Sequence, residues 1–178
     1  MSLSELAKLK EVSVSQGLML ESISNRLLKK GSAHYGSPDK VPEVRLEMIN
    51  QAGKLKIPFT SGILIGIGEN RLERVEALLA LRGLQEKYGH IQEIIIQNFK
   101  AKPRTPMQFH PEPELEEILW TIAIARILFG PEMNIQTPPN LNANNLERIL
   151  DAGINDWGGI SPLTPDHVNP EAPWPELE

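Results

Sequence analysis

Two charged side chains early in the chain have the chemistry to hold a polar ligand. Glu21 follows a mostly apolar stretch, residues 12–20, and its carboxylate could accept hydrogen bonds from both hydroxyls of a ribose. Arg45 lies a turn inside the next expected helix, where a cation opposes the helix dipole, so helix stability does not explain it. Its guanidinium could clamp a carboxylate. The alternatives are a solvated Glu21 and an exposed Arg45 paired with Glu43 or Glu47.

A glycine-rich segment forms a third candidate. Residues 63–67 are apolar on both faces, which is typical of a central parallel strand covered by helices. Gly66 and Gly68 leave the end of this strand bare, so a flat ligand could lie against the backbone. The same glycines could instead serve only a tight turn into the next helix.

Polar residues also lie at or near the ends of the other expected strands, although each is ambiguous by itself. Asn98 and Asn140 lie at or after the carboxyl ends of the strands 91–99 and 133–137, whereas Asn155 and Asp156 lie at the start of the strand 156–160. The four histidines are isolated and lack the spacing of metal ligands, so the sequence predicts no metal site. Neither a nucleophile elbow nor a phosphate-binding glycine loop with a following lysine is present in the sequence.

The elements that must position these residues alternate between strand and helix, which predicts a parallel α/β fold. An open doubly wound sheet and part of a (β/α) barrel both fit the alternation. Candidate residues at nearly every strand end favour the barrel, where such ends converge on one mouth. A complete barrel takes about 250 residues, so we expect a partial TIM-type barrel of about five strands and four helices. The expected strands are 12–20, 58–67, 91–99, 133–137 and 156–160, and the helices 43–52, 71–88, 114–129 and 144–152.

Bulk properties predict one compact body. The 178 residues are expected to form a single partial barrel domain, 1–178, with the barrel elements in 1–160 and a proline-rich tail in 161–178. A net charge of −5 with interspersed basic residues gives no reason to expect nucleic acid as a partner. No apolar run approaches the about 20 residues that span a bilayer, so we expect a cytoplasmic chain without membrane contact.

Several segments resemble one known superfamily. The segment Gly62 to Glu69 resembles the GxIxGxxE motif of radical S-adenosylmethionine (SAM) enzymes, with Leu64 in place of the usual isoleucine. Other segments are similar to the deazaflavin-forming branch of that superfamily, and the resemblance covers essentially the whole chain. These segments are residues 16–22, 97–103, 138–141, 152–159 and 164–175.

The resemblance implies a barrel whose mouth holds SAM and a 4Fe-4S cluster. The implied reaction belongs to coenzyme F420 biosynthesis: a 5′-deoxyadenosyl radical from SAM drives ring closure of a small-molecule substrate, with loss of ammonia. A companion radical SAM subunit would supply that substrate as an adduct.

The resemblance also implies roles for individual residues. Glu21 would hold the SAM ribose and Arg45 its methionine carboxylate, and the strand from Gly62 to Gly66 would meet the adenine through backbone groups. Glu69 is the last residue of the same motif, and the resemblance assigns it to the SAM site as well. The substrate would face the remaining polar residues, Asn98, Asn140, Asn155 and Asp156.

The chain departs from the family pattern in one respect. The family holds its cluster with a CxxxCxxC loop, and this sequence contains no cysteine. We therefore expect the C-terminal part of such an enzyme, inactive alone and prone to self-association through exposed sheet edges. Two other functions stay open: a non-catalytic SAM-binding or interaction module, and a metal-free barrel lyase that uses Lys102.

Overall fold

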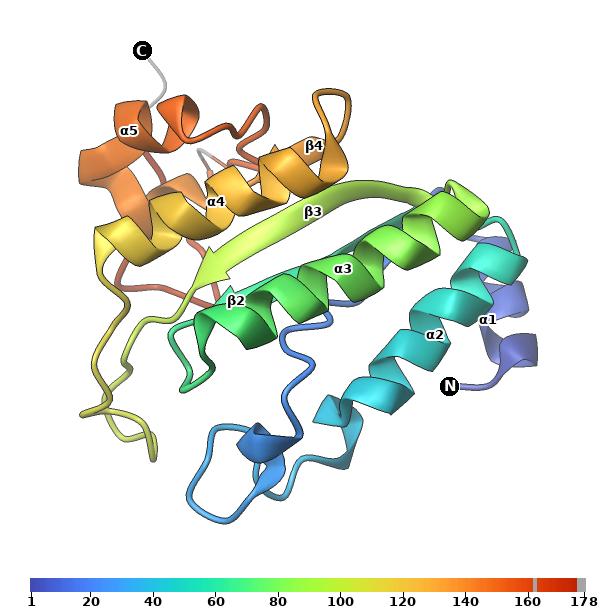
Figure 1. Cartoon of the computed structure of the whole chain (residues 1–178), viewed down its shortest axis with the longest axis horizontal. Coiled ribbons are helices and arrows are strands. Elements are labelled where there is room, and N and C mark those ends of the chain that lie inside the picture. The colour runs from blue at the N-terminus through green and yellow to red at the C-terminus, as the bar shows by residue number, and fades with distance from the viewer. Residues whose placement is uncertain (162, 176–178) are drawn as a thin grey trace.

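The computed structural model describes residues 1–161 and 163–175. Its frame is a parallel four-stranded sheet in the order β1-β2-β3-β4. Figure 1 shows α2, α3 and α4 against the same face of this sheet. A doubly wound sheet carries helices on both faces, so sequential strands with helices on one face form part of a barrel wall. The strands are β1 (Gln16–Gly17), β2 (Phe59–Ile65), β3 (Ile91–Asn98) and β4 (Asn134–Gln136).

The helices follow from clear local signals. The longest, α3, begins with a capping box in which Asn70 and Glu73 bond each other's backbone amides, and it ends at Gly89 with φ +63°. In the residues that the structure describes, no helix is long and apolar enough to cross a membrane. The helices are α1 (Leu3–Lys10), α2 (Pro42–Lys54), α3 (Arg71–Tyr88), α4 (Leu115–Phe129) and α5 (Leu146–Asp151), with short 3-10 helices η1 (Asn25–Leu28), η2 (Pro38–Lys40) and η3 (Pro139–Asn145).

The hydrophobic core lies between the sheet and the helices. On β3, Ile94 and Ile96 are fully buried, whereas the alternating residues Ile95 and Gln97 are half-buried. Because successive strand residues point to opposite faces, the first pair faces the helices and the second pair faces the uncovered side. We call this second side the open face; in a complete barrel it would face the interior.

Two predicted strands are largely absent from the sheet, whereas the other three differ from the prediction by only one or two residues at their ends. The predicted strand 156–160 is wrong as a strand, because only Asp156 pairs, in an isolated bridge to Gln136. Its carboxylate then accepts the amide of Gly158 at 2.8 Å, and this side-chain turn leads the chain away from the sheet. The predicted strand 12–20 reduces to β1 and a bridge between Glu21 and Ile63.

One helix lies outside the prediction. Helix α1 contacts α2, and its Leu6 is buried. With α1, the described residues contain five α-helices instead of the four predicted. The start of α1 is a capping box between Ser2 and Glu5, and this S-x-x-E spacing is a readable helix signal. Residues 163–175 of the predicted tail form turns, whereas 162 and 176–178 of that tail lie outside the described residues.

Candidate functional site

A cavity of about 1010 Å³ opens at the carboxyl ends of β2 and β3. Leu64 and Gln97 from the open face form part of its wall. The loops after β1, β2 and β3 surround it, and Val168 and Asn169 of the tail complete the rim. In parallel α/β folds ligands bind at this end of the sheet. Lys102 lines the same cavity and donates to the carbonyl of Val168.

Glu21 lies beside β2, near the loops that form this mouth. Its backbone N–H donates to Gly62 at 3.0 Å and its carbonyl accepts from Leu64 at 2.9 Å, so the residue extends the sheet in the left-handed conformation, with φ +64°. This geometry turns the carboxylate away from the strand and toward α2. Glu21 is nevertheless largely enclosed, with 13 % of its side chain exposed.

Three basic side chains surround the Glu21 carboxylate. Arg45 Nη1 lies 3.2 Å from Oε1, His34 Nε2 lies 3.1 Å from Oε2, and Lys40 Nζ also pairs with Oε1. Burial alone would raise the pKa of Glu21, but hydrogen bonds from His34 and Lys40 and the charge of Arg45 lower the pKa to about 2. The carboxylate is therefore ionised at neutral pH.

Arg45 is fixed in place by backbone carbonyls. Its Nε donates to the carbonyl of Asp39 at 2.8 Å, its Nη1 donates to Met19, and only 5 % of the residue is exposed. The structure thus brings Glu21 and Arg45 into direct contact. The alternative explanation, an exposed Arg45 paired with Glu43 or Glu47, is therefore wrong.

Local packing and backbone conformation explain why glycine occurs at positions 62 and 66 of the glycine-rich segment. A Cβ built at Gly62 would overlap the backbone of Ile95 on β3, so only glycine permits this close approach of the strands. Gly66 has φ +88°, and a Cβ there would lie 2.5 Å from the ring of Pro113. Protein atoms therefore fill the space beside both glycines. Gly68, at φ +107°, lines the mouth cavity instead.

Glu69 holds the turn that these glycines form. Its Oε1 accepts the N–H of Gly66 at 2.8 Å and its Oε2 accepts the N–H of Ile67 at 2.9 Å. Arg74 of α3 donates to the same carboxylate at 2.7 Å, and the Glu69 side chain is only 2 % exposed. Glu69 thus shapes the loop after β2, and its carboxylate is occupied by the loop amides and Arg74.

Asn98 and Asn140 lie on the mouth side of the sheet. Asn98 ends β3, lines the cavity and accepts from Asn142 at 2.8 Å. Asn140 donates to Asp166 at 2.8 Å and to the carbonyl of Ala172 at 3.1 Å, which fastens the tail to η3. The oxygen of the buried Asn140 amide has no hydrogen-bond partner in the described residues.

Asn155 and Asp156 do not join this group. Register places Gln136, the partner of Asp156, beside Ile95, three residues before the end of β3. Asn155 is exposed and accepts from Arg126 at 2.9 Å and from the N–H of Ile135 at 2.8 Å. Its amide therefore supports β4 and the end of α4.

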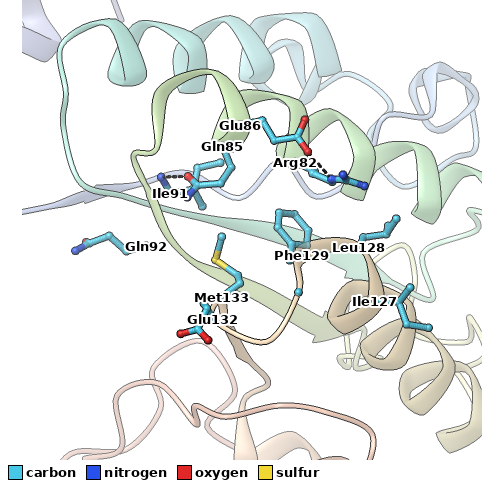
Figure 2. A pocket seen from close by; sticks show the side chains of 11 residues that line it. Arg82, Gln85, Glu86, Ile91, Gln92, Ile127, Leu128, Phe129, Glu132 and Met133 are labelled. Carbon is cyan, nitrogen blue, oxygen red and sulfur yellow. Dashed lines mark hydrogen bonds and ion pairs between the residues drawn. The ribbon is translucent and has the colours of Figure 1, made fainter.

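Arg126 is the centre of that second network. Its guanidinium donates to the carbonyls of Gly153 at 2.7 Å, Gly130 at 2.7 Å and Met133 at 2.8 Å, besides Asn155. A second cavity of about 490 Å³ lies at this end of the sheet, near Ile91 at the start of β3. Figure 2 shows its floor of Phe129, Met133 and neighbouring apolar side chains, with the Arg82 and Glu86 pair at its rim. This cavity lies at the opposite end of β3 from the mouth.

Sequence reasoning missed three side chains of the site. His34 and Lys40 contact Glu21 from a loop whose sequence shows no motif, and Arg74 sits within an ordinary amphipathic helix. Only Arg74 carried a signal, since it lies five residues after Glu69 and one helical turn inside α3.

The site residues offer groups of the kind that bind SAM but none that bind an iron-sulfur cluster. A carboxylate can accept the hydroxyls of a diol and a guanidinium can bind a carboxylate, and in this structure the two groups pair with each other. The sequence supplies no thiolate, and no group of metal-binding side chains gathers in residues 1–161 and 163–175. Ligands for a cluster would have to come from outside this chain.

Comparisons with known proteins agree on one set of relatives. The chain is 57 % identical to the 7,8-didemethyl-8-hydroxy-5-deazariboflavin synthase of Methanothermobacter thermautotrophicus, over 98 % of this chain and 52 % of that protein. It is 54 % identical to the FO synthase of Mycobacterium tuberculosis, over 100 % of this chain and 21 % of that protein. The chain thus spans about half of the first relative and a fifth of the second. No family model matches it.

Among solved structures, methylornithine synthase has a similar fold. The TM-score is 0.69 with 19 % sequence identity, and the match covers 87 % of this chain and 43 % of the synthase. At this identity the similarity concerns the fold alone. The predicted fold class, parallel α/β and part of a (β/α) barrel, is confirmed.

Proposed function

Because this chain is homologous over its whole length to part of the 7,8-didemethyl-8-hydroxy-5-deazariboflavin (FO) synthases, we propose that it forms the SAM-binding and substrate-facing part of a radical SAM enzyme of deazaflavin biosynthesis. The observation that carries this proposal is the contact between Glu21 and Arg45. This pair does not line the mouth cavity itself but adjoins it through Leu64, whose N–H donates to the Glu21 carbonyl.

Each site residue has a defined task in this proposal. The ionised Glu21 accepts the ribose hydroxyls, and Arg45 binds the methionine carboxylate in the orientation that its own backbone contacts impose. Asn98, which lines the mouth cavity, and Asn140, whose amide oxygen has no hydrogen-bond partner among the described residues, offer amide groups to the substrate. Bound SAM is the source of the 5′-deoxyadenosyl radical in this class of enzyme.

The remaining parts of the proposal concern the whole enzyme. The cluster ligands would lie in a portion that precedes this chain, so that the chain is the C-terminal part. The overall reaction would be an ammonia-releasing ring closure on an adduct made by a companion radical SAM subunit. The isolated chain would have no such activity, because it has no cysteine to hold the cluster.

A chimeric enzyme tests this function. This chain would replace the matching segment of the Methanothermobacter synthase, to which it is 57 % identical. We expect the chimera to form 5′-deoxyadenosine and deazaflavin, and we expect Glu21→Gln in the chimera to abolish both. A chimera that folds, carries its cluster and binds SAM but forms neither product would instead favour the non-catalytic SAM-binding module.

A further inference from the structure

The Glu21 carboxylate already has most of its acceptor positions filled. A carboxylate offers about two lone-pair sites on each oxygen. Oε1 accepts from both Arg45 and Lys40, and Oε2 pairs with His34. One site on Oε2 therefore stays open, whereas Oε1 is full.

A ribose diol needs a free acceptor position on each of the two carboxylate oxygens. Its two hydroxyls bind a carboxylate in bidentate fashion when each oxygen accepts one of them. Since Oε1 is full, one of its two present partners has to leave before both hydroxyls can bind.

Only one partner of Oε1 is free to leave. Arg45 is 7 % exposed at its side chain and is bonded to two backbone carbonyls, so its departure would break three contacts. Lys40 is 29 % exposed, ends the short helix η2 and has a flexible stem that reaches solvent. Glu21 would keep the charge of Arg45 when Lys40 moves away, so the buried carboxylate would stay paired.

We propose that Lys40 occupies the diol position on Glu21 in the free protein and is displaced by the ribose of a bound nucleoside ligand, while Arg45 and His34 stay. This inference rests on the proposed function, because it takes Glu21 as the ribose-binding carboxylate. Lys40 thus weakens the binding of a ligand that offers two hydroxyls, whereas a ligand with one hydroxyl can use the open site on Oε2 without displacing Lys40.

Binding of S-adenosylhomocysteine to the full chain tests the proposal. The Lys40→Met variant keeps the apolar stem and removes the ammonium group, so we expect its affinity to be about fivefold higher than that of the parent chain, as expected for loss of one partly exposed ion pair. The matched control is Lys30→Met, on an exposed lysine of the same loop, which should change nothing. With the 2′-deoxy analogue the gain from Lys40→Met should disappear.

Reactivity of the lysine amines gives a second measurement. We expect an acetylating reagent to modify Lys40 several times more slowly than Lys30 in the free chain, and S-adenosylhomocysteine should speed the modification of Lys40 alone. Equal reactivity of both lysines in the free chain would overturn the proposal without any ligand. Binding that Lys40→Met leaves unchanged or weakens would overturn it while leaving the proposed function intact. Fast, ligand-independent labelling together with no binding by any variant would contradict both.

Discussion

At the scale of single residues, the ionisation of Glu21 makes the stability of the folded chain depend on pH. Its pKa of about 2 in the folded chain lies below the 4.5 of a free glutamate, because the hydrogen bonds from His34 and Lys40 and the charge of Arg45 outweigh the effect of burial. A depressed pKa stabilises the folded state above pH 4.5, and this contribution is lost as the pH falls toward 2.

The Glu21→Gln variant should show this contribution directly. We expect its free energy of unfolding to be about 2 kcal/mol below that of the parent at pH 7, with allowance for partial exposure of the pair. Urea unfolding at pH 7 and at pH 2.5 measures the gap, which should shrink to about a quarter at the lower pH, because Glu21 is still partly ionised there. A gap of equal size at both pH values would show that the charge of Glu21 is not its cause.

Gly66 offers a prediction about backbone conformation. Gly66→Ala should lower the free energy of unfolding by about 1–3 kcal/mol, because φ is +88° and the new methyl would meet Pro113. Gly83→Ala is the matched control, since Gly83 is exposed within α3 and a methyl group added there would meet no atom within 4 Å. This control should gain about 0.5–1 kcal/mol from helix propensity. Chemical denaturation of both variants measures the contrast.

At the scale of elements, the Glu69 and Arg74 pair joins the loop after β2 to helix α3. Both side chains are buried, and Arg74 also binds Glu117 of α4 at 2.7 Å. Arg74→Met would leave the Glu69 carboxylate without its cation and should cost about 3–5 kcal/mol of stability. Arg82→Met removes only an exposed pair with Glu86 and should cost less than about 0.5 kcal/mol.

A double variant separates the pair from other effects of Arg74. Glu69→Gln with Arg74→Met should be less destabilising than the sum of the single changes, because the amide no longer needs a counter-ion. Denaturant midpoints of the four proteins give this coupling. Strict additivity would mean that Glu69 is held by the loop amides alone.

The sequence predicts elements best where local signals and burial agree. Helix α3 has the bounds that the sequence predicts, because Asn70 and Gly89 mark both ends. The strand after Ile154 is overestimated, since its apolar residues give no sign of the turn that Asp156 makes with Gly158. Strand pairing depends on partners distant in the sequence, and local patterns do not encode when it stops.

The candidate site is predictable to a similar degree. Glu21 and Arg45 are expected to share a ligand, and the structure places them in contact. The positions of His34 and Lys40 could not be predicted, because the loop between β1 and α2 reaches Glu21 only through the fold. Asn155 is predicted to face the substrate from the family resemblance alone, whereas its hydrogen bond to Ile135 places it level with Ile94, in the middle of β3 rather than at its carboxyl end.

At the scale of the whole molecule, the uncovered sheet predicts self-association. Strand β1 has a neighbour on one side only, and half-buried apolar side chains such as Leu64 and Ile95 lie on the open face. We expect the isolated chain to form dimers or larger species at micromolar concentration. Sedimentation velocity over a concentration series measures this, and a stable, concentration-independent monomer would contradict it.

The hydrogen bonds of Arg126 stabilise the end of the sheet that lies away from the mouth cavity. One guanidinium fastens the end of α4, the start of β4 and the loop at Gly153, all away from the mouth. The loops that surround the mouth cavity take no part in this anchoring. Changes of length or sequence in residues 100–113 or in the tail would therefore leave the last strands in register, so a family built on this frame could acquire new substrates by altering the mouth alone.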